Sequence, residues 1–174
     1  GFLNNVLVEE DDRAHNVKTN IKLCRAIIKK EFNEEPILSY QLKGDDLQFA
    51  KEFLQEHIIK EQDLIIGFHA GCSTLKNHIK RRWEPEKFAK LAKRLIEEHS
   101  AKILLFGGTD EKELKTEIFR LINSENVLII ETESLNQSSA IMKRCNVFIT
   151  NDSSQMHIAS AFQLKVVALI GPTN

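Results

Sequence analysis

The sequence predicts an open, doubly wound α/β domain built on a parallel sheet of the Rossmann type. Three observations lead to this fold class. Short apolar runs alternate with longer segments of helical periodicity from residue 64 onward. The runs are apolar almost throughout, as expected of strands buried on both faces. Polar loops follow four of the runs, so the strands should point the same way and be joined by right-handed crossovers.

Five strands and four helices make up this pattern. In chain order the predicted strands read LIIGFH, KILLFGG, NVLII, NVFIT and KVVALI. The helices between them read PEKFAKLAKRLIEEH, DEKELKTEIFRLIN, SLNQSSAIMKRC and SSQMHIASAF. Pro85 suits the first turn of the first helix, and Ser134 is predicted to cap the third.

The first 62 residues have a different pattern. AHNVKTNIKLCRAIIKKEF and DDLQFAKEFLQEHII each place apolar residues on one helical stripe, and EEPILSYQLKG between them has strand-like composition. We therefore expect residues 1–62 to form a helical interdomain or linker segment and residues 63–174 to form the Rossmann-like domain. Because the last strand is followed only by GPTN, we expect a fragment of a longer chain.

Composition excludes several classes of function. The 174 residues carry a net charge of -1, so no global basic field indicates a nucleic-acid partner. The six histidines are scattered, and the cysteines, Cys24, Cys72 and Cys145, are odd in number and far apart. The sequence therefore predicts neither a zinc site nor a disulfide framework, and it favours a reducing compartment. No apolar run is long enough to span a bilayer, so the cytoplasm is the expected location.

The polar loops after the strands should meet at one edge of the sheet, where open α/β domains bind ligands. These loops read HAGCST, GGTDE, TNDSSQMH and GPTN. Their candidate binding residues are Ser73, Thr74, Gly107, Gly108, Glu111, Asp152, Ser153, Ser154, His157 and Thr173.

The loop TNDSSQMH favours a phosphate site. Asp152 and Gln155 have the spacing of a capping box, so a helix should begin near Ser153. Its first N–H groups attract phosphate, Ser153 and Ser154 can add hydroxyl donors, and His157 should face the same turn. The alternative is that Asp152 only caps the helix and His157 is an ordinary helix residue. Three further polar loops at the same edge favour the ligand site.

Two neighbouring loops fit an anionic nucleotide. Arg81 lies in a basic run that can contact phosphate, although such runs are more often solvated, and Trp83 is predicted to be a packing anchor. Gly107 and Gly108 allow a tight turn, and an acid after them can accept hydrogen bonds from ribose. The two glycines fall short of G-x-G-x-x-G, so NAD is not predicted. The sequence also lacks a G-x-S-x-G nucleophile elbow.

Four segments together resemble a known family. KRRWEPEKFAKLAKRL, ILLFGGTDEKE, FITNDSSQMHIASAF and VVALIGPTN, in this order, resemble the donor-binding half of glycosyltransferase family 9, the heptosyltransferase-like enzymes. The resemblance covers residues 64–174. It implies a two-domain GT-B fold and metal-independent, inverting transfer of a sugar, typically a heptose. It implies a nucleotide-diphosphate sugar as donor, with ADP-heptose as the leading candidate, and a lipopolysaccharide-core acceptor. It implies neither a cofactor nor a metal.

The resemblance also assigns residues. Asp152, Ser153 and His157 would surround the donor diphosphate and sugar, and Glu111 would hold the nucleoside. Arg81 lies where the family usually has a lysine against the diphosphate, and Thr173 lies in the loop closing the same edge. Three positions depart from the family pattern: Ser154 replaces a glycine, Arg81 replaces the lysine, and Glu84 replaces a proline that occurs one residue later.

The resemblance places the acceptor domain, with the general base, before residue 1 and a further helix after residue 174. We therefore expect no catalytic residue in this chain and no transfer by it alone. The expected partners are the nucleotide-sugar donor and a lipid-linked or lipopolysaccharide-core saccharide, with peripheral association of the full enzyme at the inner face of the cytoplasmic membrane. Two alternatives stay open: a non-catalytic nucleotide-sugar-binding module, and a sugar-nucleotide epimerase, against which the missing G-x-G-x-x-G counts.

Overall fold

The computed structural model describes residues 5–9, 11, 13–31, 37–72 and 82–171. The chain forms two compact units, Gly1–Ile37 and Leu38–Asn174. The first unit contains α1, Asn16–Ile28, which confirms the first predicted helix. Its N-cap is His15, whose Nδ1 accepts a hydrogen bond from the Val17 N–H at 3.3 Å. No residue of α1 is buried: in its apolar stripe Val17 and Ile21 are half-buried, and Cys24, Ile27 and Ile28 are exposed.

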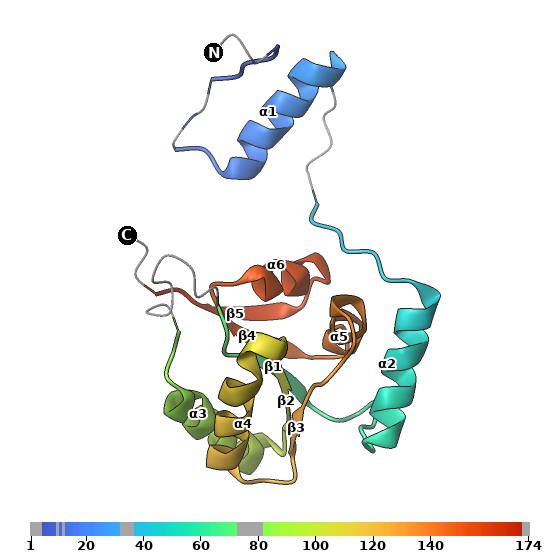
Figure 1. The fold of residues 1–174 in the computed structure, drawn as a ribbon, viewed down its shortest axis with the longest axis vertical. Helices are drawn as coiled ribbons and strands as arrows, with labels where there is room; N and C mark the ends of the chain where they lie inside the picture. The colour runs from blue at the N-terminus through green and yellow to red at the C-terminus, as the bar shows by residue number, and fades with distance from the viewer. Residues whose placement is uncertain (1–4, 10, 12, 32–36, 73–81, 172–174) are drawn as a thin grey trace. The chain divides into compact units, whose positions relative to one another are not determined.

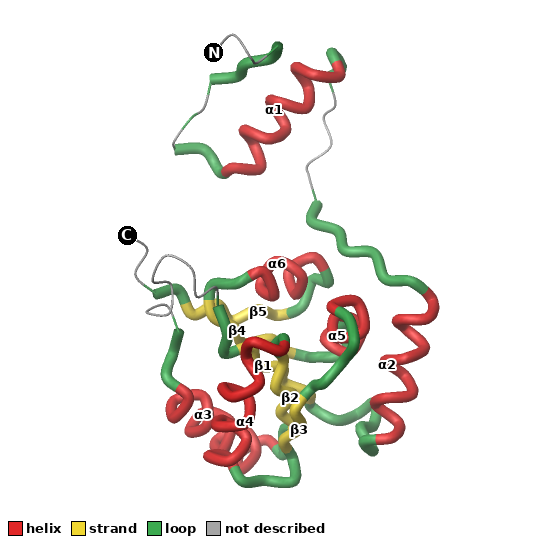
Figure 2. The backbone as a smooth tube through the Cα atoms, viewed as in Figure 1, coloured by secondary structure: helices red, strands yellow, loops and turns green. Residues whose placement is uncertain are grey.

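The second unit is built on a parallel sheet of five strands in the order β3-β2-β1-β4-β5 (Figures 1 and 2). The strands are β1 Ile65–His69, β2 Lys102–Phe106, β3 Val127–Ile129, β4 Val147–Asn151 and β5 Lys165–Leu169. From β1 the chain first adds β2 and β3 on one side of the sheet and then β4 and β5 on the other side, as in Rossmann folds. The predicted fold class is therefore confirmed.

The helices between the strands also match the sequence pattern. They are α3 Pro85–His99, α4 Lys112–Ile122, α5 Leu135–Met142 and α6 Ser154–Ala161, with a short 3₁₀ turn, η2 Thr109–Glu111, before α4. Pro85 occupies the first turn of α3. Ser134 caps α5 by accepting a hydrogen bond from the Gln137 N–H at 3.2 Å, as predicted.

The two faces of the sheet bury separate cores. Helices α3 and α4 cover one face, where Phe68 and Phe88 are almost fully buried. Helices α5 and α6 cover the other, where the rings of Phe106 and Phe148 lie 5.4 Å apart. At the centre of the sheet a Cβ on Gly67 would lie 2.5 Å from the Phe148 ring, so this strand position has room only for glycine. Truncating Phe106 or Phe148 to alanine should lower the free energy of unfolding by about 3–5 kcal/mol.

Helix α2, Gly44–Glu56, belongs to the second unit and packs against α5. It buries Ala50 and Leu54, and the Tyr40 O–H ahead of it donates to Asn136 Oδ1 at 2.7 Å. The connection before α2, which has strand-like composition, is irregular over the described residues 37–43. Tyr40 and Leu42 in this connection pack against the core as partly buried side chains. The interdomain role of residues 1–62 stays a prediction.

Within the described part of the chain, no helix has the length and apolar character needed to cross a bilayer.

Candidate functional site

His69 lies at the centre of a buried polar cluster at the carboxyl edge of the sheet. It is the last residue of β1 and is 3% exposed. Its Nε2 lies 3.5 Å from Glu111 Oε1, on the turn after β2. Its Nδ1 lies 3.1 Å from Ser153 Oγ and 3.3 Å from Thr150 Oγ1, both at the end of β4. The predicted meeting of the loops after β1, β2 and β4 is therefore confirmed, but the sequence did not indicate His69 as their hub.

Glu111 is held in place from several sides. Besides its contact with His69, its Oε2 accepts a hydrogen bond from the Gly108 N–H at 2.7 Å. The hydrogen bond with His69 is the main reason why the pKa of this carboxyl lies below its usual value, and burial offsets part of the effect. A Cβ at Gly71 would overlap the carboxylate, and Gly107, at φ +153°, also abuts it. The glycines therefore let Glu111 pack directly against the backbone.

Asn151 ties β4 to the loop after β1. It is fully buried, its Nδ2 donates to the Ala70 carbonyl at 2.7 Å, and its Oδ1 accepts from the Trp83 N–H at 3.1 Å. The Trp83 ring packs edge-on against Phe88 with centroids 5.1 Å apart, which confirms the predicted packing role. These contacts hold the ends of β1 and β4 and the approach to α3 in one arrangement.

The start of α6 differs from the prediction in one respect. The N-cap residue is Ser153 and the helix begins at Ser154, so the assignment of Asp152 as the cap is wrong. The physical reason is tertiary: the contact of the Ser153 hydroxyl with His69 favours an extended backbone at Ser153, so the helix starts one residue later than predicted. The Ser153 hydroxyl makes no cap hydrogen bond. The first N–H groups of α6 are thus not capped by their own N-cap side chain. Ser154 and His157 are exposed on this helix.

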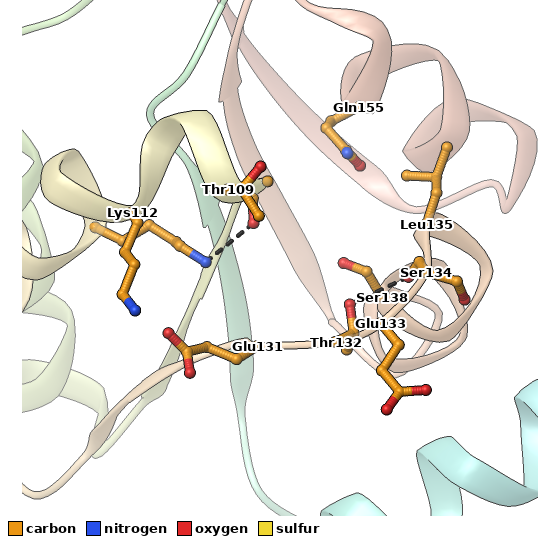
Figure 3. Close-up of a pocket in the computed structure, with 12 residues that line it drawn as sticks. Thr109, Lys112, Glu131, Thr132, Glu133, Ser134, Leu135, Ser138 and Gln155 are labelled. Carbon is orange, nitrogen blue, oxygen red and sulfur yellow. Dashed lines mark hydrogen bonds between the residues drawn. The ribbon is translucent and has the colours of Figure 1, made fainter.

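A pocket of about 470 Å³ opens beside this cluster, at the carboxyl ends of β2 and β3. Figure 3 shows Thr109 and Lys112 on one side, the Glu131–Ser138 segment on the other, and Gln155 of α6 above. Gln155 Oε1 is enclosed and has no hydrogen-bond partner among the residues that the structure describes. The remaining lining residues include the predicted Gly107 and Gly108, but Glu111 does not line this pocket.

Lys115 forms part of the pocket lining although it is only 5% exposed. Its Nζ donates to the carbonyls of Gly107 at 3.0 Å and Ile130 at 2.9 Å, so it joins the ends of β2 and β3. Burial lowers the pKa of this lysine, and the nearby Glu131 and Glu111 oppose the shift. The sequence prediction missed Lys115; its position on the buried face shared with Ile118 and Ile122 was the available signal.

The remaining predicted site residues, Ser73, Thr74, Arg81 and Thr173, lie outside the described residues. The neighbouring Arg82 is described, and its guanidinium donates to the Cys72 carbonyl at 3.0 Å.

Comparisons with known proteins agree on one family. The model of glycosyltransferase family 9 (heptosyltransferase) matches residues 2–174. Lipooligosaccharide heptosyltransferase 2 of Campylobacter jejuni (serotype O:6) is 33% identical over 84% of this chain and 47% of its own length. Lipopolysaccharide heptosyltransferase 2 of Escherichia coli K12 is 32% identical over 80% of this chain and 40% of its own length.

Two solved structures extend the agreement to the fold. A glycosyl transferase family 9 protein from Veillonella parvula has a TM-score of 0.80 at 27% identity, over 94% of this chain and 46% of that one. The ADP-heptose heptosyltransferase II of E. coli has a TM-score of 0.66 at 28% identity, over 82% of this chain and 43% of that one. The chain spans about half the length of the curated relatives it matches. It belongs to glycosyltransferase family 9, the heptosyltransferase family.

Proposed function

We propose that this chain is the donor-binding part of a glycosyltransferase that moves a heptose from ADP-heptose to a lipopolysaccharide-core-type saccharide. The observation that carries the proposal is the pocket at the ends of β2 and β3, which lies beside the start of α6, where the N-cap Ser153 side chain makes no cap hydrogen bond. This pairing suits a nucleoside joined to a diphosphate. The relatives named as heptosyltransferases and the E. coli structure named for ADP-heptose support the sugar and the base.

The nucleoside is proposed to occupy the pocket, with Gly107 and Gly108 beneath it. Gln155 Oε1, which has no partner within the described part of the chain, can accept a hydrogen bond from the ligand. Glu111 is proposed to accept from ribose hydroxyls. Its carboxylate already accepts from Gly108 and faces His69, but two carboxylate oxygens offer about four acceptor sites in all.

The diphosphate is proposed to lie at the start of α6, where the helix dipole and backbone N–H groups favour anions. Ser153, Ser154 and His157 are the proposed contacts on this helix, with Ser73, Thr74, Arg81 and Thr173 contributing from the neighbouring loops. Asp152 is proposed to accept a hydrogen bond from a sugar hydroxyl and not to contact the diphosphate. Its carboxylate and the phosphates are both anionic, so they would repel each other.

In the proposed reaction an acceptor hydroxyl attacks the anomeric carbon, the bond from that carbon to the diphosphate oxygen breaks, and the configuration inverts. A general base from the acceptor domain takes the hydroxyl proton. The donor-binding part stabilises the departing diphosphate with helix-terminal N–H groups and Arg81 and uses no metal or cofactor. We expect this chain alone to bind donor and not transfer it, and the full enzyme to work at the cytoplasmic face of the membrane.

Calorimetric titration of this chain with ADP and UDP tests the proposal. We expect weak binding that favours ADP. Ser138→Trp, which fills the pocket from α5, should weaken ADP binding roughly tenfold or more, which is about 1.4 kcal/mol. Glu117→Trp, at an exposed position on α4, is the matched control and should bind as the parent does. Equal ADP binding by both variants would contradict the proposed pocket, and a requirement for added Mg²⁺ by the full enzyme would contradict metal independence.

A further inference from the structure

We infer that His69 is a positioning residue that couples the nucleoside half of the donor site to the diphosphate half. Its Nε2 lies against Glu111, the proposed nucleoside residue, and its Nδ1 lies against Ser153, the N-cap of α6. The inference deepens the proposed function and rests on it for the identity of the two halves. His69 itself is 3% exposed, so its role is to act through these two partners.

For a ring that carries a single proton, the geometry assigns the hydrogen bonds. The Glu111 carboxylate accepts only, so the proton must lie on Nε2, and Nδ1 is then the acceptor. Two hydroxyls lie near Nδ1, at 3.1 Å and 3.3 Å. Thr150 uses its single proton on the Asn151 carbonyl, at 2.8 Å. Ser153 has the remaining proton, and its hydroxyl lies 3.2 Å from Thr150 Oγ1 and 3.1 Å from His69 Nδ1. We assign the proton to the imidazole nitrogen, which is the stronger acceptor and has the shorter contact.

This assignment links the two halves physically. A phosphate oxygen at the start of α6 competes with Nδ1 for the Ser153 proton, and a ring released by Ser153 is held less firmly against Glu111. In the opposite direction, a ribose hydroxyl that donates to Glu111 weakens the contact between Glu111 and His69, and the ring is then held less firmly against Ser153. The ring itself stands on β1, which pairs with β2 and β4 at this residue, so its backbone is fixed while its partners change. A histidine that only filled the core would not connect the effects of changes at Glu111 and Ser153.

A double-mutant cycle on ADP affinity separates these possibilities. The dissociation constants of Glu111→Gln, Ser153→Ala and the double variant are measured by calorimetry in the parent and in His69→Asn. We expect the effects in the parent to depart from multiplicativity by roughly threefold or more, and to combine within about 1.5-fold in His69→Asn. Multiplicative effects in the parent, or the same departure without His69, would overturn the inference.

A second measurement needs no ligand. Glu111→Gln should shift the backbone amide resonances of Ser153 and Ser154 in the parent and leave them in place in His69→Asn. Glu113→Gln, exposed in the first turn of α4, and Ser160→Ala, exposed near the end of α6, are the matched controls. If Glu111→Gln leaves those amides unmoved in the parent, the inference fails.

The two arms distinguish failure of the inference from failure of the proposed function. Absence of ADP binding would contradict the proposed function, and the amide arm alone would then decide the role of His69. If His69→Asn does not fold, His69→Gln takes its place in both arms.

Discussion

The two neighbouring regions of the candidate site are built in opposite ways. The His69 cluster is tightly packed: its side chains hydrogen-bond to one another, and the backbone at Gly71 and Gly107 lies directly against the Glu111 carboxylate, whose side chain keeps 17% of its surface exposed. The pocket beside it is open, about 470 Å³, and its rim carries the exposed side chains of Lys112 and Glu133. Changes in the cluster should therefore cost both folding free energy and ligand affinity, whereas changes on the pocket rim should alter affinity alone.

Lys115 belongs to both regions and gives the largest expected effect. Lys115→Met removes the donor of two hydrogen bonds and leaves the carbonyls of Gly107 and Ile130 unsatisfied. We expect the free energy of unfolding to fall by about 2–4 kcal/mol. Urea unfolding measures this, with Lys93→Met, exposed on α3, as the control. A loss of ADP affinity with unchanged stability would instead place Lys115 with the pocket rim.

Gly71→Ala tests whether the cluster is as closed as its contacts indicate. The added Cβ would overlap the Glu111 carboxylate, so the side chain must move away from His69. We expect a loss of about 1–3 kcal/mol in stability, together with weaker ADP binding. Gly44→Ala, where the new Cβ meets nothing within 4 Å, is the matched control. A stable Gly71→Ala variant with normal affinity would show that the cluster can rearrange freely.

Glu111→Gln should reveal the cluster through pH. The pKa of Glu111 lies below its ordinary value of 4.5, so the charged carboxylate stabilises the folded chain above pH 4.5. This contribution is lost as the pH falls through the lowered pKa of the folded state. The parent should therefore be more stable than the variant at pH 6, and the difference should shrink below pH 4.5. Thermal unfolding across this range measures it, and a difference that grows on acidification would contradict the sign.

Glu133→Gln gives the smallest expected effect and tests the open side of the comparison. Glu133 is exposed on the pocket rim, so its loss should change the free energy of unfolding by less than about 0.5 kcal/mol. Removing one negative charge should strengthen binding of anionic ADP by less than about threefold, and added salt should erase the gain. Calorimetry at low and high salt measures this. A large loss of stability would show that the rim is structural.

The sequence predicted more of the scaffold than of the site, and the reason is the range of the interactions. Strand alternation and the Ser134 cap depend on residues close in sequence, and the structure confirms both. The polar edge followed from parallel strands, so the meeting of Glu111 and Ser153 near β1 was predictable in outline. The assignment of Asp152 as the N-cap was wrong because Ser153 stays extended, with its hydroxyl in contact with a histidine 84 residues away. Lys115 was missed because the carbonyls that satisfy a buried lysine cannot be read from its neighbours.

The difference in exposure between His157 and His69 also allows chemical labelling to monitor the candidate site. Diethyl pyrocarbonate acylates accessible imidazoles, so the exposed His157 should react and the buried His69 should be spared. Both sit at the same edge of the sheet, so digestion and mass mapping of the two peptides would monitor that edge at single-residue detail. Protection of His157 would report occupancy of the α6 start, and new reactivity at His69 would report opening of the β1 end, within one sample and without a fluorescent label.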